Sequence, residues 1–275
     1  MAISDNELHA ISELITLKTG IIPRDSHKAG IKNYVEKYID SKAITFSSYY
    51  TLISNNSSEF SALINESTVN ETYLFREEKQ FLLLKNKIFP AWIRKNGSKP
   101  IRMWSAACSY GEEAYSMALL ANACNIKAEI YASDINTRAL ENCRNGKFRE
   151  ASKRIGDGET FYPLFTGYQQ SDGYYLFPEE IKNKITTIQL NLVELEKHMA
   201  QVPRKVNIVF IRNVFIYFSI ELRAKILKFI TDYCLEPDGY LFVSMNEIAQ
   251  IDSAIMPPNL EKIAEDNVFC FHKKI

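Results

Sequence analysis

Several features that would place a chain in a functional class at once are missing from this sequence. Its five cysteines are scattered without a C-x-x-C pair, and its four histidines do not stand at metal-ligand spacing. This pattern predicts reduced, buried thiols and no metal site. The cysteines are Cys108, Cys124, Cys143, Cys234 and Cys270.

Neither sign of charge is in excess, because 33 lysines and arginines are balanced by 33 aspartates and glutamates. The field of the whole molecule therefore favours neither a nucleic acid nor a membrane surface. No apolar run reaches the roughly 18 residues of a membrane span. The first residues, MAISDNE, also lack the basic and apolar segments of a secretory signal. We expect a cytoplasmic protein that binds no nucleic acid and does not insert into a membrane.

The chain has the length and composition of an ordinary globular protein. Its 275 residues can hold one large domain, or a small domain followed by one of standard size. In the first seventy residues the apolar positions recur at helical spacing, as in Leu8, Ile11, Leu14 and Ile15 before Gly20. Further helices are expected from about residues 25, 45 and 57. We therefore predict a small all-α domain over residues 1–69.

Beyond that point the pattern changes to an alternation of helix and strand. A long helix is expected from Lys79, with Pro90 near its end. The order that follows predicts an α/β domain with a mainly parallel sheet over residues 70–275. A Gly-, Tyr- and Phe-rich stretch at about 145–184 interrupts the rhythm and predicts an inserted small β-subdomain, and residues 235–239 predict a turn. The other expected strands cover residues 101–104, 129–132, 185–190, 206–211, 240–244 and 267–273, and the other expected helices cover 112–123, 136–143 and 220–234.

The most informative segment is the turn between the first strand and its helix. It lacks the G-x-G-x-x-G pattern that lets a backbone approach a pyrophosphate. The helix begins instead with Glu112 and Glu113, and acids at a helix N-terminus repel phosphate. They suit a cationic ligand, so S-adenosylmethionine, a sulfonium, fits better than NAD or ATP. The alternative is that both glutamates only complement the helix dipole.

Polar residues follow several expected strands, at the edge where doubly wound sheets bind ligands. Asp134 stands where an acceptor for a ribose diol belongs, although it is equally suited to cap the next helix. Asn191-Leu192 and Arg212-Asn213 follow later strands. A charge such as Arg212 after an apolar run is costly unless it reaches a cleft or a partner, which favours a functional role.

Two further residues have competing interpretations. Arg76 closes a polar segment and could bind a carboxylate through two hydrogen bonds, or pair at the surface with Glu77 or Glu78. Tyr217 lies in an otherwise apolar segment, which favours a core aromatic.

Taken together, these segments resemble the CheR-type chemoreceptor glutamate methyltransferases. The resemblance covers nearly the whole chain and rests on five blocks in the family's order: NETYLFRE, WSAACSYGEEAYS, ASDI, IRNVFIYF and LEPDGYLF. It implies a Rossmann-like S-adenosylmethionine methyltransferase sheet with an inserted β-subdomain, preceded by a helical domain. One departure lies after the late strand, where the family's glycine-histidine-serine-glutamate is replaced by a segment ending in Glu247.

The resemblance also implies roles for individual residues. Arg76 and Tyr217 are expected to lie near the transferred methyl group and the substrate carboxylate. The residues expected to contact S-adenosylmethionine are Asn70, Thr72, Arg76, Glu113, Asp134, Asn191, Leu192, Arg212 and Asn213.

The implied activity is methyl transfer from S-adenosylmethionine to glutamate side chains on the cytoplasmic helices of methyl-accepting chemotaxis receptors. The family's arginines on the second N-terminal helix are lysines here, interrupted by Glu36 and Asp40. The acceptor could therefore differ while the fold and donor stay the same. A module that binds S-adenosylmethionine for regulation is the remaining alternative.

Overall fold

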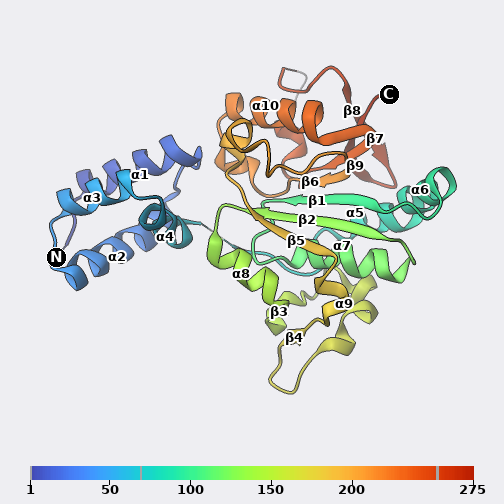
Figure 1. Ribbon diagram of the computed structural model, residues 1–275, viewed down its shortest axis with the longest axis horizontal. Coiled ribbons are helices and arrows are strands. Elements are labelled where there is room, and N and C mark those ends of the chain that lie inside the picture. The colour runs from blue at the N-terminus through green and yellow to red at the C-terminus, as the bar shows by residue number, and fades with distance from the viewer. Residues whose placement is uncertain (1, 69, 252–253) are drawn as a thin grey trace.

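The computed structural model describes residues 2–68, 70–251 and 254–275. Within these residues the main sheet has seven strands in the order β5-β2-β1-β6-β7-β9-β8 (Figure 1). The first five strands in this order run parallel to one another, whereas β9 is antiparallel to both β7 and β8. The α/β prediction is confirmed. The strands are β1 (Ile101–Ala106), β2 (Ala128–Asp134), β5 (Ile185–Gln189), β6 (Val206–Phe210), β7 (Leu235–Phe242), β8 (Leu260–Glu265) and β9 (Val268–Lys273).

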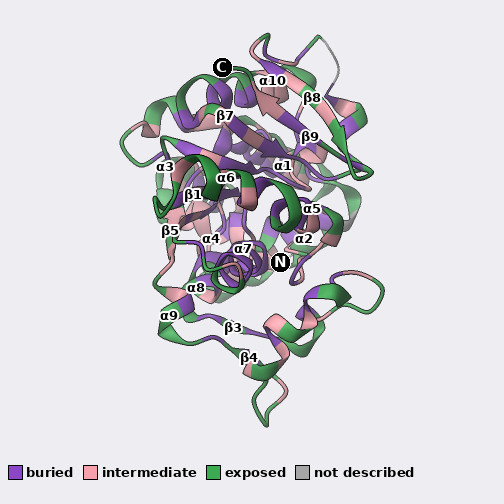
Figure 2. Cartoon of the chain, turned by 90° about the vertical axis from the view of Figure 1, so that its right-hand side faces the viewer, coloured by how far each residue is buried: buried purple, intermediate pink, exposed green. Residues whose placement is uncertain are grey.

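Helices cover both faces of this sheet and also form a separate layer at the N-terminus (Figure 1). The alternation of side chains along the strands explains the two faces: Met103 packs on one side and the next residue, Trp104, on the other. Figure 2 shows this interior as buried. The helices are α1 (Asp5–Thr19), α2 (Asp25–Lys42), α3 (Phe46–Asn55), α4 (Ser57–Ser67), α5 (Glu78–Leu83), α6 (Phe89–Asn96), α7 (Glu112–Ala123), α8 (Thr137–Asn145), α9 (Glu179–Lys182) and α10 (Ile220–Phe229).

The four N-terminal helices enclose their own small core, which includes Ile11, Ile31 and Leu63. Ser4 begins α1 with a capping box, and Gly20 ends it in a left-handed conformation with φ of 71°. A Cβ atom on Gly20 would lie 2.7 Å from Val193 and 2.8 Å from Leu222, which belong to the sheet domain. The end of α1 is therefore pressed closely against that domain.

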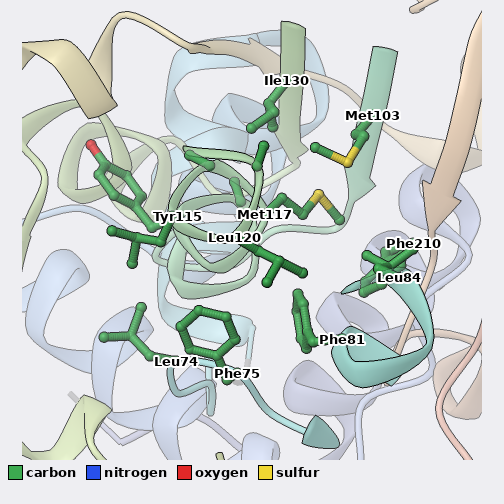
Figure 3. Packing of buried hydrophobic residues seen from close by; sticks show 14 of the residues in the cluster. Leu74, Phe75, Phe81, Leu84, Met103, Tyr115, Met117, Leu120, Ile130 and Phe210 are labelled. Atoms are coloured by element: carbon green, nitrogen blue, oxygen red, sulfur yellow. The ribbon is translucent and has the colours of Figure 1, made fainter. Parts of the chain in front are cut away.

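The helix predicted from Lys79 continues beyond Pro90. A π-helical turn, η1 (Leu84–Ile88), joins α5 to α6, and Pro90 stands in the first turn of α6. Proline cannot donate a backbone N–H and collides with the carbonyl four residues earlier, so the wider π turn accommodates it without ending the helix. On the face of the sheet that α7 covers, Phe81 of this helix packs with Phe75, Leu120 and Phe210 (Figure 3).

The inserted segment contains less β structure than expected. Its strands β3 (Lys147–Phe148) and β4 (Tyr175–Leu176) pair over two residues each, and the rest is mostly short 3₁₀ turns. Its stability comes from aromatic packing instead. Phe161 stacks on Phe75 with ring centres 4.4 Å apart, and Phe165 packs edge-on against Tyr175.

Near the C-terminus one prediction was wrong and one strand was not predicted. Residues 235–239 were expected to form a turn but lie within β7, where Asp238 has a positive φ of 65° and the register with β6 shifts. The turn residues therefore form a bulge in a strand. Strand β8 was not predicted, because LEKIAE is not strongly apolar. It pairs with β9 to form an antiparallel edge of the sheet.

The five cysteines lie in the described part of the chain and are free thiols; four are buried and Cys124 is partly exposed. No helix formed by residues 2–68, 70–251 and 254–275 is both long and apolar enough to cross a membrane.

Replacing Phe161 by alanine should destabilise the protein by about 3–5 kcal/mol, because a buried stacked ring would leave a cavity between the insert and the sheet domain. Urea unfolding followed by circular dichroism would measure the loss. Ile155→Ala, in the same insert, is the matched control: its side chain is 88% exposed, so the change should stay within about 0.5 kcal/mol. Equal effects of the two substitutions would contradict this account.

Candidate active site

A cavity with an empty volume of about 940 Å³, counting its open mouth, lies beside the carboxyl ends of β1, β2, β5 and β6. This is the edge at which doubly wound sheets bind ligands, where the strand order reverses between β1 and β6. The N-terminal helices complete its wall. The lining residues are Thr19, Ile21, His27, Ser67, Thr68, Asn70, Glu71, Thr72, Arg76, Ala107, Cys108, Ser109, Glu113, Asp134, Ile135, Leu190, Asn191, Leu192, Arg212, Asn213, Val214, Tyr217 and Phe218.

The turn from β1 into α7 forms the floor of the cavity. Ala107 and Ser109 have left-handed φ values of 78° and 53°, and the N–H groups of Ala107 and Cys108 both donate to the Ser133 carbonyl at 2.8 Å. Gly111 ends the turn with φ of 106°. A Cβ there would lie 2.5 Å from Cys143 Sγ, so the turn needs a glycine at this position.

Asp134 stands at the end of β2 and is 8% exposed. Its Oδ2 accepts the N–H of Ser109 at 2.8 Å, and its Oδ1 accepts the N–H of Asn136 at 2.9 Å. Burial raises the pKa of Asp134, and these N–H groups oppose that rise. The cap of α8 is Asn136, not Asp134. The capping interpretation of Asp134 was therefore wrong, and its carboxylate instead joins two loops at the cavity.

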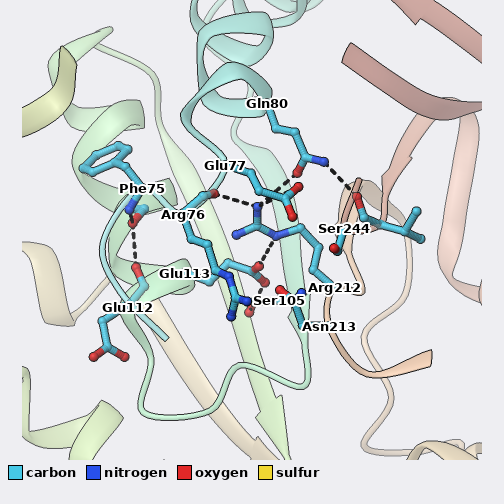
Figure 4. Close-up of polar contacts among 12 residues, drawn as sticks. Phe75, Arg76, Glu77, Gln80, Ser105, Glu112, Glu113, Arg212, Asn213 and Ser244 are labelled. Carbon is cyan, nitrogen blue, oxygen red and sulfur yellow. Dashed lines mark hydrogen bonds and ion pairs between the residues drawn. The ribbon is translucent and has the colours of Figure 1, made fainter. Parts of the chain in front are cut away.

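Arg212 is buried at the end of β6 and binds three segments at once (Figure 4). Its Nε donates to Glu113 Oε2 at 2.6 Å, and its Nη1 donates to the Arg76 carbonyl at 2.7 Å and to Gln80 Oε1 at 3.1 Å. Glu113 also accepts the Ser105 hydroxyl at 2.6 Å. The expectation that Arg212 reaches a cleft or a partner is confirmed on both counts.

The two glutamates that open α7 have different surroundings, which corrects the expectation that both face a cationic ligand. Glu113 lines the cavity, but Arg212 already neutralises its charge. Glu112 is 4% exposed and turns toward the insert, where its Oε1 accepts the Ser152 hydroxyl at 2.8 Å. Its Oε2 is buried without a hydrogen-bond partner among the described residues, and burial raises the pKa of Glu112 to about 7.

Arg76 is carried on a strained loop that the insert fixes in place. Its two neighbours, Phe75 and Glu77, both have left-handed φ values of 57°. Asp157 of the insert accepts the N–H groups of Glu77 at 2.7 Å and Glu78 at 3.0 Å.

The Arg76 guanidinium lines the cavity and donates to the Glu71 carbonyl at 2.9 Å. Among the described residues no carboxylate pairs with it, so the surface ion pair with Glu77 or Glu78 does not form.

The remaining predicted contacts lie around the same cavity. Asn191 caps the 3₁₀ turn η5 (Leu192–His198), and its Nδ2 donates to the Lys18 carbonyl at 2.8 Å, which links the sheet edge to α1. Leu192 is buried beside it. Asn70 and Thr72 also line the cavity, and Asn70 Oδ1 accepts the hydroxyl of Ser109, in the turn after β1, at 3.5 Å.

Tyr217 also lines the cavity, which excludes a purely core role. Burial raises the pKa of its hydroxyl, so this group is a protonated donor near neutral pH. Its loop, together with Asn213, is held by Glu247, a fully buried carboxylate that accepts the N–H groups of Asn213 at 2.7 Å, Ser244 at 3.2 Å and Ile216 at 3.3 Å.

Sequence reasoning missed two residues that the structure brings to this region. The divergent segment that ends in Glu247 was expected to change the floor of the cleft, but Glu247 itself was not named as a site residue. His27 of α2 lines the cavity although its helix lies far away in the sequence. The signal used to find the others was a polar residue directly after a predicted parallel strand; His27 lies on a predicted helix, and Glu247 stands three residues beyond the expected strand 240–244.

Comparison with known proteins agrees with this geometry. Residues 70–259 match the family model for the CheR methyltransferase SAM-binding domain. The chain belongs to the CheR methyltransferase family. It is 32% identical over 255 residues to the chemotaxis protein methyltransferase of Escherichia coli K12, a match that covers 90% of this chain and 86% of that protein. The corresponding protein of Borreliella burgdorferi is 30% identical over 257 residues, 89% of each chain.

A chemotaxis protein methyltransferase of Pseudomonas putida is 33% identical over 193 residues, 67% of this chain and 68% of that one. As a CheR family member, the chain is an S-adenosylmethionine-dependent methyltransferase, and the predictions of family, enzyme class and donor are confirmed. Within residues 2–68, 70–251 and 254–275, no group of three or more His, Cys, Asp or Glu side chains is placed to hold a metal ion.

Glu112→Gln should remove a pH dependence of stability. The pKa of Glu112 is about 7 in the folded protein and about 4.3 in an unfolded chain, so the folded form binds the proton more tightly. The resulting stabilisation is complete below about pH 4.3 and is lost as the pH rises through about 7.

Between pH 5 and pH 8, wild-type stability should therefore fall by roughly 2–3 kcal/mol relative to that of the variant. Urea unfolding at the two pH values measures this difference. Glu141→Gln, at an exposed position on α8, is the matched control and should follow the wild type. Parallel curves for wild type and Glu112→Gln would show that another group is responsible.

Proposed function

We propose that this methyltransferase transfers the methyl group of S-adenosylmethionine to glutamate side chains of chemotaxis receptors and produces a methyl ester. Its family and its named relatives support the activity. The observation that carries the assignment of residues is the position of Arg76. Its guanidinium lines the same cavity as Asp134 and Tyr217 and has no carboxylate partner among the described residues.

The residues around the cavity fit the donor. The two oxygens of Asp134 each accept one backbone N–H and retain capacity for a further donor, as a ribose diol requires. In this proposal the donor is contacted by Asn70, Thr72, Arg76, Glu113, Asp134, Asn191, Leu192, Arg212 and Asn213.

S-adenosylmethionine supplies, when bound, a methyl group activated by a positively charged sulfur. The acceptor glutamate is already ionised near pH 7, so its oxygen needs no general base. The task of the protein is therefore to position the carboxylate, which can account for much of the rate enhancement. Arg76 and the Tyr217 hydroxyl orient the carboxylate, and the Arg76 guanidinium is itself positioned by the Glu71 carbonyl and the Tyr73 ring.

The acceptor is assigned to the cytoplasmic helices of a chemotaxis receptor. This assignment rests on the names of the relatives, which are chemotaxis protein methyltransferases. The α2 helix departs from the family's arginine-rich face, so the receptor is expected to differ in the charges that it presents to this helix.

Arg76→Ala should lower the rate of methyl transfer by about 100-fold, because it removes the cationic donor that orients the carboxylate. Tyr217→Phe should lower the rate by a smaller factor, about tenfold, because it removes one hydroxyl donor. Arg144→Ala is the control: Arg144 lies on α8, is exposed, and bonds Thr187 outside the cavity. Full rates in both of the first two variants would exclude these roles.

The assay that tests the function uses full-length protein, radiolabelled S-adenosylmethionine and cytoplasmic receptor fragments. Base-labile methyl label on the fragment is the expected result, since methyl esters of glutamate hydrolyse in base. Donor binding without label on any fragment would favour a regulatory module, and stable label would indicate a different acceptor group. Absence of donor binding by calorimetry would contradict all three.

A further inference from the structure

His27 is a polar residue in the wall of the cavity for which the proposed reaction provides no role. It stands in the first turn of α2 and is 8% exposed. Its ring faces that of Tyr217, with the ring centres 5.9 Å apart. It lines the same cavity as Tyr217 and Arg76. A buried imidazole needs hydrogen-bond partners, so the surroundings of its two nitrogens decide what it can do.

The two ring nitrogens are not equivalent. Nδ1 is fully buried and has no hydrogen-bond partner among the described residues, although the residue as a whole lines the cavity. A buried N–H without an acceptor is costly, and the proton of a neutral imidazole therefore resides on the nitrogen that can reach a partner. We assign the Nε2–H tautomer, which makes Nε2 the hydrogen-bond donor of the ring.

The surroundings of His27 also keep the ring neutral. Burial, and next the charge of Arg24, lower the pKa of His27. The positive end of the α2 dipole acts in the same direction, because His27 stands in the first turn of that helix. The imidazole is therefore a neutral hydrogen-bond donor near pH 7.

The groups around this donor favour a carboxylate. The Arg24 guanidinium lies over the Tyr217 ring, 5.3 Å from its centre, and the Arg76 guanidinium lines the same cavity. The Tyr217 ring is thus flanked by the His27 imidazole and the Arg24 guanidinium, and the charges of Arg24 and Arg76 both act on its hydroxyl. Glu71 lines the cavity as well: its backbone carbonyl bonds Arg76, and its carboxylate, whose charge also acts on Tyr217, pairs with Arg154 of the insert at 3.2 Å.

We propose that His27 Nε2 donates a hydrogen bond to a carboxylate held beside Tyr217 and Arg76, and so makes α2 part of the binding site. This inference rests on the proposed function. The carboxylate belongs either to the acceptor glutamate or to the methionyl part of the donor, which share the same chemistry. His27 is in either case a binding residue supplied by the N-terminal helices.

Two substitutions in the full-length protein test the proposal. His27→Phe keeps a ring against Tyr217 but removes the hydrogen-bond donor. His27→Gln keeps a side-chain N–H that extends about as far as Nε2. Calorimetry with S-adenosylmethionine and with its decarboxylated analogue measures donor binding, and steady-state transfer to receptor fragments measures the acceptor. His9→Phe is the matched control, because His9 is an exposed histidine on α1 that pairs with Glu13. Thermal unfolding midpoints verify that every variant is folded.

If the donor's carboxylate is the partner, His27→Phe should weaken binding of S-adenosylmethionine about tenfold and leave the decarboxylated analogue unchanged. If the acceptor's carboxylate is the partner, donor affinity stays constant and kcat/KM for the receptor fragment falls about tenfold. In both cases His27→Gln should recover most of the loss.

Values within twofold of wild type in both measurements, with active wild-type enzyme, overturn the role of His27 alone. Unchanged donor affinity together with a wild type that labels no fragment overturns this inference and the proposed function together.

Discussion

The site depends on the buried ion pair between Arg212 and Glu113. This pair joins the end of β6 to the start of α7, and the same guanidinium holds the carbonyl of Arg76. Through Gln80, whose Nε2 donates to the Val243 carbonyl at 2.7 Å, the network extends to the end of β7. Removing one partner of a buried pair leaves an uncompensated charge, which typically costs about 3–5 kcal/mol. Four segments that are distant in sequence therefore keep one arrangement around the cavity.

Much of the fold and part of the site could be predicted from the sequence, for one physical reason. In a parallel sheet the carboxyl ends of strands meet at one edge, so polar residues that follow apolar runs converge there, as Asp134, Asn191 and Arg212 do. What failed depended on tertiary contacts. The direction in which Glu112 turns is set by Ser152 of the insert, and the bulge at Asp238 exists because β7 pairs with β6.

His27 and Glu247 show that the same dependence on tertiary contacts limited the prediction of site residues. A histidine in the first turn of a helix, or a glutamate after the last parallel strand, has no spacing that marks it as part of a cavity. Their positions follow from how α2 and the segment after β7 pack on the loop around Tyr217. Just before α2, the N–H of Ile22 donates to the Tyr217 carbonyl at 3.2 Å and so ties the helix to this loop. The insert has a comparable effect on the other wall, where Asp157 fixes the loop of Arg76.

The close approach of Gly20 to Val193 and Leu222 has a consequence for how the two parts of the chain can be recombined. The N-terminal helices have a core of their own, which suggests a unit that could be exchanged between relatives to alter acceptor choice. The junction restricts such exchange: an incoming helical unit must end its first helix with a residue that has no side chain, in a left-handed conformation, at this contact. A chimera made without that glycine would strain the left-handed end of the helix and press on Val193 and Leu222, which would have to shift.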